Sequence, residues 1–575
     1  MESPVAQLTG PGAPFEIAVE DVCGTPLSVY KQRFASMQDL IGIADTRPDV
    51  DWLAQGERRL TFGEHNALVR GVATALLELG VEPGDRVAVL SANNIEWVVM
   101  FWACAAIGVA CVPLNAWWKA EELDFALRDS GARALVCDLK RWLVVCDIVG
   151  ALPDLAHVFA MDLEAPDKGA RPGVDLFARE DPGTLPAATV CEDDLLAILY
   201  TSGTTGKPKG ATVTHRQALA NLQNLALLNA TAAAASAPEP QEAASNGQAA
   251  TLLVVPLFHV TGALASMVTA YAAGAKLVLM PPGRFDPEEA MATIERERVT
   301  NIGGVPTVMW RIVEHDTFHE YDLSSVARIG YGGAPAAPEL VEKIKVAFPQ
   351  VRQSLSTAYG LTETASVATV NAGDDYFSHP DSVGRPVPTV EATVVDPDGN
   401  QLPLGETGEI ALRGPTIMMR GYWNRPDATD AVFLPGGWFR TGDIGRIDGE
   451  GFVYLSDRAK DMIIRGGENV YCVEIEHVLF EHPDVLDAAV VGVPHRTLGE
   501  EVKAVVQLRA GSRTTADDLR VYCSERLASF KVPEYLELRD EPLPRNPAGK
   551  ILKQLLRGDS EDSAFTPSAD DDSAL

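Results

Sequence analysis

The stretch from Tyr200 to Gly210 combines glycines, hydroxyl side chains and lysines. An apolar run, Leu195 to Leu199, precedes it and predicts a buried strand. Glycine lets backbone N–H groups approach an anion closely, while hydroxyls add hydrogen bonds and lysines add positive charge. We therefore predict a cradle for a polyphosphate, in preference to an ordinary polar turn between a strand and a helix. The cradle residues are Thr201, Ser202, Gly203, Thr204, Thr205, Gly206 and Lys207.

The cradle differs from the P-loop of nucleoside triphosphatases, whose pattern is Gly-x-x-x-x-Gly-Lys-Ser/Thr. Aligning that pattern on Gly206 and Lys207 would require a glycine where Thr201 stands and a hydroxyl where Pro208 stands. The sequence therefore excludes the P-loop way of holding phosphates and Mg²⁺.

Two further positions are suited to the nucleoside part of such a ligand. Gly332 and Gly333, in front of Ala334 and Pro335, let a flat ring lie against bare backbone; the alternative is a simple strand-to-helix turn. The carboxylate of Asp443 can accept both hydroxyls of a ribose, although a lone aspartate is most often a turn residue.

Between Thr357 and Glu363 an aromatic, a glycine, a hydroxyl and a carboxylate occur close together. Tyr359, next to Gly360, can stack on a base. Thr362 can bond a phosphate oxygen, and Glu363 is a hard oxygen ligand suited to Mg²⁺. The structural alternative is a helix N-terminus capped by Thr362, and a helix N-terminus itself favours anions.

These segments resemble, in composition and in order, the motifs of the adenylate-forming enzymes, which include acyl-CoA synthetases, luciferases and the adenylation domains of peptide synthetases. The resemblance spans about residues 50 to 555. It implies that ATP activates a carboxylate as an acyl-adenylate and that coenzyme A then takes up the acyl group. It also implies ATP, Mg²⁺ and coenzyme A as cofactors, with Thr204 and Glu363 as ligands of the metal ion.

The resemblance assigns catalytic roles to Lys550, His259, Thr362 and Glu363. Lys550, in a Gly-Lys-Ile context near the C-terminus, would bridge the attacking carboxylate and the phosphate. His259, which follows an apolar run from Leu252, would line the carboxylate site. Taken alone, such a histidine is usually a satisfied core residue.

The resemblance also implies that a small C-terminal domain rotates about Lys460. Lys550 would leave the site, and the motif from Gly466 would approach to line a channel for the pantetheine arm of coenzyme A. A plain hairpin turn is the alternative at this motif. The residues with implied nucleotide or coenzyme A contacts outside the cradle are Gly332, Gly333, Ala334, Pro335, Tyr359, Gly360, Asp443, Arg458, Lys460, Gly466, Gly467 and Glu468.

Composition limits the classes of function. With 575 residues the chain is too long for one core, so at least two domains are expected. A formal net charge of −32 argues against a nucleic-acid partner. The eight cysteines include no Cys-x-x-Cys pair and the N-terminus lacks a signal-peptide pattern, so we expect reduced thiols and a cytoplasmic location. The apolar run from Trp97 to Leu114 predicts a buried helix, a turn at Gly108 and a core strand, in preference to a membrane span.

Strands alternating with helices predict an α/β fold, with a large N-terminal domain of layered α/β subdomains plus a β-rich subdomain and a small mobile α+β C-terminal domain. The predicted domains are 1–457, the adenylate-forming part, and 458–558, the mobile part, before a disordered acidic tail over 559–575. Residues 1 to about 30 show no strong pattern, and the low-complexity stretch 229–250 predicts a flexible surface loop.

The clearest local signals concern a few elements. Thr61 is predicted to cap a helix over residues 64–79 that ends at Gly80. Further helices are predicted over 473–480 and 516–524.

Taken together, the sequence predicts an acyl-CoA synthetase, an acid–thiol ligase, that acts on a medium- or long-chain fatty acid. The linker from Gly466 to Asn469 resembles that of fatty-acid ligases, and Gly262, Ala263 and the residues 332–334 predict a roomy pocket. The alternatives are an aryl- or other carboxylate–CoA ligase, adenylation with transfer to a carrier protein, and a nucleotide-binding regulator without turnover. The expected partner is a small carboxylic acid; a homodimer and a peripheral membrane contact stay open.

Overall fold

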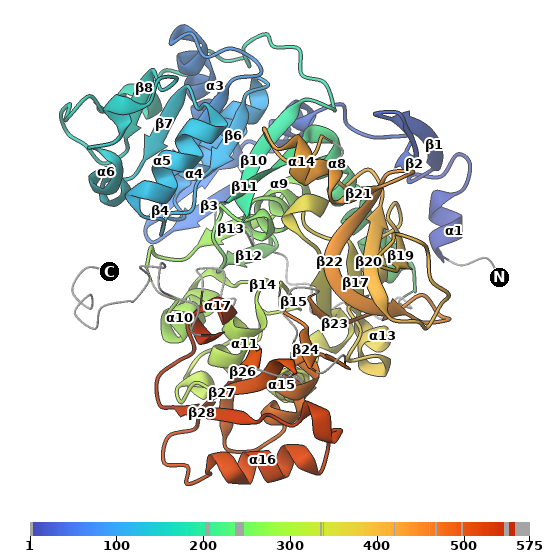
Figure 1. Cartoon of the computed structure of the whole chain (residues 1–575). Helices are drawn as coiled ribbons and strands as arrows, with labels where there is room; N and C mark the ends of the chain where they lie inside the picture. Colours follow the sequence, from blue (N-terminus) through green and yellow to red (C-terminus); the bar gives the residue numbers. More distant parts are fainter. Residues whose placement is uncertain are drawn as a thin grey trace.

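The computed structural model describes residues 4–201, 208–235, 247–283, 285–333, 336, 338–418, 420–458, 461–465, 468–495, 498–545 and 551–557. Over these residues the strands form two large sheets, two smaller sheets and an N-terminal hairpin. Figure 1 shows helices packed around the large sheets, a β-rich part beside them and a smaller C-terminal part. The predicted α/β class, with a large N-terminal part and a smaller C-terminal part, is confirmed.

The first large sheet is parallel except at one edge, where the strand that comes last in the chain runs antiparallel to its neighbour. Its described strands, in order across the sheet, are β11 (Lys209–Thr214), β10 (Leu195–Thr201), β6 (Ala110–Pro113), β5 (Arg86–Leu90), β7 (Ala134–Cys137), β8 (His157–Ala160) and β9 (Arg171–Pro172). Its helices are α3 (Phe62–Glu78), α4 (Ile95–Ala106), α5 (Ala120–Ser130), α6 (Leu139–Val145) and α7 (Val174–Phe177). Both faces are buried, because Val87 and Val89 of β5 pack with α3 and α4 while Ala88 and Leu90 pack with α5 and α6.

The second large sheet has parallel central strands and antiparallel edges. Its described strands, in order, are β18 (Arg385–Pro386), β17 (Thr369–Ala372), β16 (Leu355–Tyr359), β15 (Arg328–Gly332), β14 (Asn301–Gly304), β12 (Ala250–Leu253), β13 (Lys276–Leu279), β3 (Asp51–Gln55) and β4 (Arg58–Thr61). Its helices are α2 (Met37–Ala44), α9 (Thr269–Ala273), α10 (Pro287–Glu297), α11 (Pro306–Val313) and α12 (Pro338–Ala347). Helices α10 to α12 share a core with one face, whereas α2 and α9 share a core with the other.

The β-rich part is an antiparallel sheet that follows the second large sheet in the chain. Its described strands are β19 (Glu391–Val395), β20 (Gly408–Arg413), β21 (Phe433–Leu434), β22 (Trp438–Ile447) and β23 (Val453–Arg458), and the short helices α13 (Gly373–Ser378) and α14 (Pro426–Asp430) accompany it. Its core includes Tyr359 and Ala368, so it packs directly on the segment that leaves β16.

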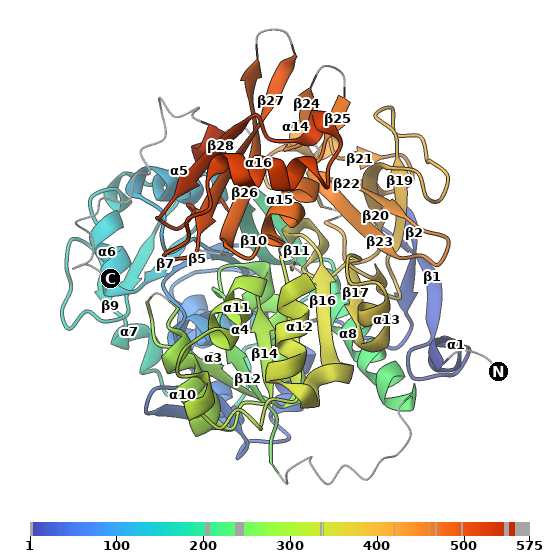
Figure 2. The same cartoon turned by 90° about the horizontal axis from the view of Figure 1, so that it is seen from below.

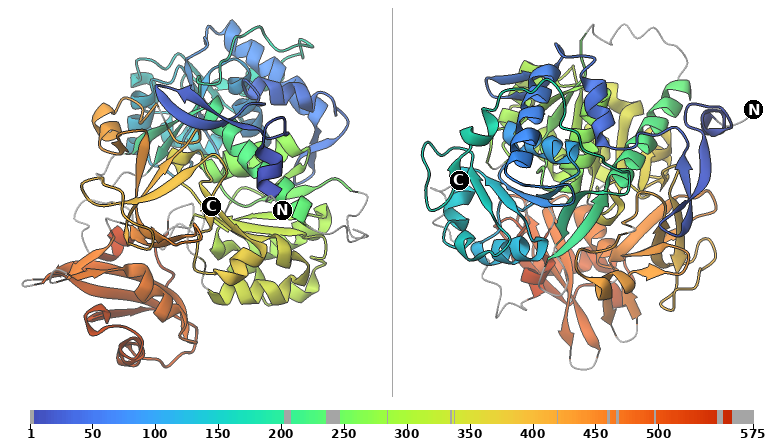
Figure 3. Two further views of the ribbon diagram at one scale, coloured as in Figure 1. Left: turned by 90° about the vertical axis from the view of Figure 1, so that its right-hand side faces the viewer. Right: turned by 90° about the horizontal axis from the view of Figure 1, so that it is seen from above.

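The C-terminal part has a sheet and a core of its own, to one side of the rest of the molecule (Figure 3). Its described elements are β24 (Ile463–Arg465), β25 (Glu468–Val470), α15 (Cys472–Phe480), β26 (Val485–His495), β27 (Gly499–Leu508), α16 (Ala516–Ser524), β28 (Tyr535–Arg539) and α17 (Lys553–Arg557). The helices predicted over 473–480 and 516–524 are confirmed. Arg509 of this part lies 3.7 Å from Glu314, which follows α11.

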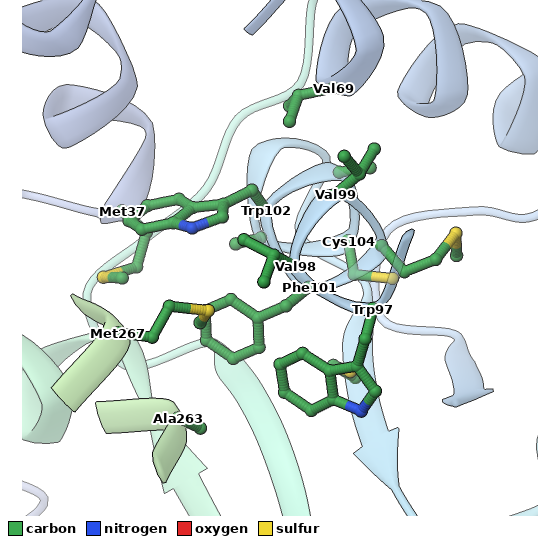
Figure 4. Close-up of a cluster of buried hydrophobic side chains, with 14 of the residues drawn as sticks. Met37, Val69, Trp97, Val98, Val99, Phe101, Trp102, Cys104, Ala263 and Met267 are labelled. Carbon is green, nitrogen blue, oxygen red and sulfur yellow. The ribbon is translucent and has the colours of Figure 1, made fainter. Parts of the chain in front are cut away.

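Helix α4 lies between the two large sheets and confirms the prediction of a buried helix in the apolar run. Trp97 and Trp102 are fully buried in a core that also contains Met37 and Met267 (Figure 4). Gly108 follows the helix with a φ of 67° and turns the chain into β6. Among the described residues, no helix is both long and apolar enough to cross a membrane.

Residues 1 to about 30, whose sequence shows no strong pattern, include regular secondary structure. The segment forms helix α1 (Pro4–Thr9) and an antiparallel hairpin of β1 (Ile17–Val22) and β2 (Thr25–Tyr30). Cys23 and Gly24 have φ angles of 51° and 82°, as a two-residue hairpin turn requires. The hairpin lies beside the β-rich sheet (Figure 2), where Arg413 donates to the Pro26 carbonyl at 2.6 Å. A cysteine in the turn hides the Asn-Gly or Asp-Gly signal by which such hairpins are predicted.

The start of the flexible loop predicted over 229–250 is wrong, because helix α8 (His215–Ala235) continues to residue 235. Alanine has the highest helix propensity, and extending an existing helix is far easier than starting one, so the helix continues into the alanine-rich stretch. Residues 236–246 lie outside the described part of the chain, and β12 begins at Ala250.

Candidate active site

The predicted polyphosphate cradle connects β10 to β11. The two strands pair up to Thr201 and Lys209, and the Thr201 hydroxyl donates to the Lys209 carbonyl at 3.4 Å. A Cβ at Gly210 would lie 2.7 Å from Ile198 Cγ2, so only glycine allows this close pairing. The remaining cradle residues, 202–207, lie outside the described residues.

The carboxyl ends of β12, β14, β15 and β16 meet at one edge of the second large sheet, because these strands are parallel neighbours. Ligands of open α/β sheets bind at such an edge. β15 ends at Gly332 before Gly333, β16 ends at Tyr359 before Gly360, and the segment after β12 carries His259. Five sequence-predicted residues therefore end or follow strands that finish side by side.

The two glycines after Tyr331 serve different needs. A Cβ at Gly332 would lie 2.5 Å from the carbonyl oxygen of Ala358, so glycine here permits close pairing with β16. Gly333 is exposed, has a φ of 76°, and an added Cβ would meet no atom closer than 3.9 Å. Gly333 thus presents open backbone, as predicted contact with a flat ring requires. Ala334 and Pro335 lie outside the described residues.

A buried hydrogen bond joins two predicted nucleotide-binding residues that are 84 positions apart in the chain. The Tyr359 hydroxyl donates to Asp443 Oδ2 at 2.6 Å, and the two residues are only 8% and 4% exposed. Asp443 lies in β22, where backbone pairing places it opposite Arg458 of β23. The bond ties the β-rich sheet to the carboxyl end of β16.

The turn after β16 differs from the alternative of a helix capped by Thr362. Residues Thr362–Thr364 form a single turn of 3-10 helix, and the Thr364 hydroxyl, not that of Thr362, accepts from the Leu361 N–H at 2.9 Å. Ala365 and Ser366 then adopt φ angles of 50° and 103°. Residues other than glycine rarely adopt such angles, and this kind of strain concentrates at functional sites.

Glu363 is held by Tyr422, a residue that the sequence did not reveal. The Tyr422 hydroxyl donates to Glu363 Oε1 at 2.7 Å, and the Lys209 ammonium lies 5.3 Å from the centre of the Tyr422 ring. Burial, together with the neighbouring Glu363 carboxylate, raises the pKa of Tyr422. No motif marks Tyr422, because its importance comes from a contact with a residue 59 positions away.

His259 is half-buried and lies beside an aromatic ring. Its Nε2 is out of contact with solvent and has no hydrogen-bond partner among the described residues. Burial lowers the pKa of His259 to about 4, so the ring is neutral at neutral pH. The Phe258 ring centre lies 4.7 Å from that of His259 and 5.1 Å from that of Trp117, which follows β6 of the other large sheet. An unpaired ring nitrogen in this position can form a hydrogen bond with a ligand carboxylate.

The prediction of a roomy pocket is wrong for Gly262 and Ala263. A Cβ at Gly262 would collide with the carbonyl group of Pro256, so glycine permits a close backbone contact. Ala263 is 1% exposed and belongs to the core that contains Met267 (Figure 4). Both residues lie in a π-helix, Thr261–Val268, a rare element that is frequent at functional sites. Their small size serves close packing and leaves no open space.

The residues predicted for the coenzyme A channel fall at a hairpin. β24 and β25 pair antiparallel, with Arg465 opposite Glu468. Gly466 and Gly467 connect the two strands in sequence and lie outside the described residues, as does Lys460. The flanking strands have the hairpin geometry that was the structural alternative for this motif.

Lys550 also lies outside the described residues, but the chain on both sides of it is anchored. Arg545 and Ile551 form an isolated antiparallel bridge, and the Arg545 guanidinium pairs with Asp487 of β26 at 2.6 Å. The segment that carries Lys550 therefore begins and ends on the C-terminal part.

Glu363 fits a Mg²⁺ ion that is shared with a nucleotide. Its Oε2 accepts no hydrogen bond from any residue in the described part of the chain. In nucleotide sites Mg²⁺ usually takes one or two protein carboxylates and completes its shell with phosphate oxygens and water. The described residues contain no group of three or more His, Cys, Asp or Glu side chains able to hold a metal ion.

Comparison with known protein families identifies the chain. The model of the AMP-binding enzyme family matches residues 43–423, and the model of the AMP-binding enzyme C-terminal domain matches residues 474–550. The chain belongs to the adenylate-forming acyl-CoA synthetase family. Acyl-CoA synthetases use ATP and coenzyme A on a small carboxylic acid, so the chain is an acid–thiol ligase.

Two relatives of this acyl-CoA synthetase share the same identity with it but carry different names. A feruloyl-CoA synthase of an Amycolatopsis species is 36% identical over 513 residues, which cover 89% of this chain and 96% of the relative. The long-chain-fatty-acid–CoA ligase FadD13 of Mycobacterium tuberculosis is 36% identical over 514 residues, which cover 87% and 93%. The ATP-bound structure of MatB from Rhodopseudomonas palustris matches with a TM-score of 0.79 and 29% identity, covering 91% of this chain and 99% of MatB.

Proposed function

We propose that this acyl-CoA synthetase activates a medium- or long-chain fatty acid. The observation that carries the proposal is the setting of His259, whose Nε2 lies out of contact with solvent beside the ring of Phe258. No described residue forms a hydrogen bond with this nitrogen, and the Phe258 ring in turn contacts Trp117, which is 40% exposed. Apolar walls with one polar group suit an alkyl chain that ends in a carboxylate. The linker from Gly466 to Asn469, which resembles that of fatty-acid ligases, supports the same choice.

An aryl carboxylic acid is the second candidate substrate. The edge contact between Trp117 and Phe258 also suits a planar aromatic acid. The relative named feruloyl-CoA synthase is as similar to this chain as the fatty-acid ligase is. The close packing at Gly262 and Ala263 favours an aryl acid too, because it removes space that a long chain would occupy.

In the first step of the proposed reaction, a carboxylate oxygen attacks the α-phosphorus of ATP. The acyl-adenylate bond forms and pyrophosphate leaves with the electrons of the broken bond. Asp443 would hold the ribose, and neutral His259 would orient the carboxylate. Lys550 would stabilise the negative charge that builds up between acid and phosphate. Mg²⁺, bound by Thr204 and Glu363, would supply further charge neutralisation at the phosphates.

In the second step, the thiol of coenzyme A loses its proton and attacks the acyl carbon, so that a thioester forms and AMP leaves. The C-terminal domain, 458–558, would rotate against the domain 1–457 about Lys460 and bring the motif from Gly466 to the site. The sheets support this division, since β23 ends at Arg458 and the next strand belongs to a different sheet. No covalent enzyme intermediate is needed.

A panel of acids tests the proposed substrate. Pyrophosphate release and thioester formation are measured with short, medium and long saturated fatty acids and with hydroxycinnamic and benzoic acids, each with and without coenzyme A. We expect the highest kcat/KM with a medium- or long-chain acid, and thioester only when coenzyme A is present. A higher kcat/KM with an aromatic acid would replace the fatty-acid proposal with the aryl one. Acyl-adenylate that accumulates without thioester in the presence of coenzyme A would indicate a carrier protein as the acceptor.

A further inference from the structure

The segment around Tyr422 is fixed against β11, the strand that follows the cradle. The Trp423 N–H donates to the Gly210 carbonyl at 2.7 Å, and Tyr422 forms an antiparallel bridge with Ala211. On its own side, the Tyr422 N–H donates to the Thr429 hydroxyl at 2.9 Å. The backbone from which the Tyr422 ring projects is therefore held at several points.

The same segment holds Glu363 at two atoms. The Tyr422 hydroxyl donates to Oε1 at 2.7 Å, and the Met418 N–H donates to the Glu363 carbonyl at 2.9 Å. Oε2 accepts nothing from the described residues. One carboxylate oxygen is thus oriented by Tyr422, and no described residue forms a hydrogen bond with the other.

The Tyr422 ring connects this carboxylate with a cation beside the cradle. The Lys209 ammonium lies 5.3 Å from the ring centre, within the range of a cation–π interaction. The Tyr422 hydroxyl is the donor in its bond to Glu363, because an ionised carboxylate oxygen can only accept.

We propose that Tyr422 is a positioning residue that directs the Glu363 carboxylate toward a divalent cation carried by the nucleotide triphosphate. The inference rests on the proposed role of Glu363 as a metal ligand. Without the hydroxyl, Oε1 loses its donor and the side chain gains rotamer freedom that metal binding must then remove. Removing the hydroxyl should therefore lower the affinity for ATP in the presence of Mg²⁺ and leave the affinity for metal-free ATP unchanged.

Tyr422→Phe tests the inference, because it removes the hydroxyl and keeps the ring that contacts Lys209. The affinity for ATP is measured by titration calorimetry with excess Mg²⁺ and, separately, with EDTA. We expect binding to be about tenfold weaker with Mg²⁺, which equals about 1.4 kcal/mol, and unchanged with EDTA. The matched control is Tyr454→Phe, whose hydroxyl donates to Asp448 at 3.1 Å in the β-rich sheet; this variant should bind ATP like the wild type under both conditions.

Three results would overturn the role of Tyr422: unchanged Mg²⁺-dependent binding, tighter Mg²⁺-dependent binding, or an equal loss with Mg²⁺ and with EDTA, which indicates a merely structural residue. Glu363→Gln gives a second route that leaves Tyr422 in place, and it should also lose affinity only with Mg²⁺. In that background Tyr422→Phe should add less than about a twofold loss, because the two residues act as a unit; full additivity contradicts the inference. Equal binding with Mg²⁺ and EDTA in the wild type would refute the metal role of Glu363 itself.

Discussion

Asp443 and Tyr359 come from different sheets, yet a bond of 2.6 Å joins them in a buried position. The sequence predicts a separate role for each residue, Asp443 as a ribose ligand and Tyr359 as a stacking partner for a base. Their contact shows that the two residues share one place in the fold. It leaves their ligand contacts as a prediction, which a charge-removing substitution can test.

Asp443→Asn should weaken ATP binding without disrupting the fold. Asparagine keeps a carbonyl oxygen that can accept the Tyr359 hydroxyl, but it lacks the negative charge that strengthens hydrogen bonds to ribose hydroxyls. Because a hydrogen bond to a charged group contributes roughly 1.5–3 kcal/mol, the KM for ATP should rise by about tenfold or more. Pyrophosphate release at saturating acid measures it, and the KM for the acid should stay unchanged. A wild-type KM for ATP would remove Asp443 from the site.

Lys550→Ala should impair the first step far more than the second. The ammonium group is proposed to stabilise charge as the acyl-adenylate forms, so adenylation should fall by about a hundredfold or more, whereas a supplied acyl-adenylate should still react with coenzyme A. The two half-reactions are measured separately, by pyrophosphate release and by thioester formation. Equal losses in both would contradict the role given to this lysine.

The π-helix Thr261–Val268 owes its position to close backbone contact. Gly262→Ala would place a Cβ against the Pro256 carbonyl, so we expect a loss of about 1–3 kcal/mol in stability and lower activity as the segment after His259 shifts. The control is Gly42→Ala at an exposed position of α2, where an added Cβ meets nothing within 4 Å. That change should stabilise the protein slightly, since alanine restricts the unfolded chain. Melting temperatures compare the two, and equal values would show that Gly262 is not needed for packing.

Elements with strong local signals were predictable from the sequence. The helix α3 begins after Thr61 because Thr61 and Glu64 bond each other's backbone N–H groups, a pattern that is visible in the sequence. The hairpin of β1 and β2 was not predictable, because its turn uses Cys23 and because its partners, such as Arg413, are distant in the chain. Local patterns therefore predicted local structure, and long-range contacts supplied the rest.

The candidate site shows the same division. The sequence predicts Tyr359, Glu363 and Asp443 as site residues because they belong to motifs, and the structure brings Tyr359 and Asp443 into contact. Tyr422 was not found, because nothing in its neighbourhood signals that its hydroxyl reaches Glu363. The prediction of a roomy pocket at Gly262 is wrong, because small residues in a sequence can indicate either an open pocket or close packing. In the structure Gly262 permits close packing.

Three histidines are expected to make the molecule less stable in acid. Burial lowers the pKa of His65, His215 and His259 to about 4, below the usual value near 6.5. The unfolded chain therefore binds more protons than the folded one between about pH 4 and pH 6.5. The contribution of these histidines to the free energy of unfolding should be fully present above about pH 6.5. It should fall as the pH drops toward 4, by up to about 1.4 kcal/mol per pH unit for each histidine.

His215→Asn isolates one of these contributions. His215 Nδ1 accepts the Met37 N–H at 3.1 Å, and the asparagine oxygen can take over this bond without titrating. Melting temperatures between about pH 4 and pH 7 should fall less steeply for this variant than for the wild type. The control is His319→Asn at an exposed position, which should keep the wild-type slope. Identical slopes for both variants would contradict the assignment of His215.

The pairing of β22 with β23 has a consequence for communication within the enzyme. Asp443 lies directly across the backbone ladder from Arg458, the last residue of β23, and only one residue separates Arg458 from Lys460. If the ribose of the nucleotide binds at Asp443, it binds next to β23, the strand that leads into the C-terminal domain. Suppose that the bound nucleotide favours one orientation of the C-terminal domain by a certain factor. Thermodynamic reciprocity then requires that this orientation binds the nucleotide more tightly by the same factor. The release of AMP and the rotation of the C-terminal domain back to its first orientation would then be thermodynamically coupled.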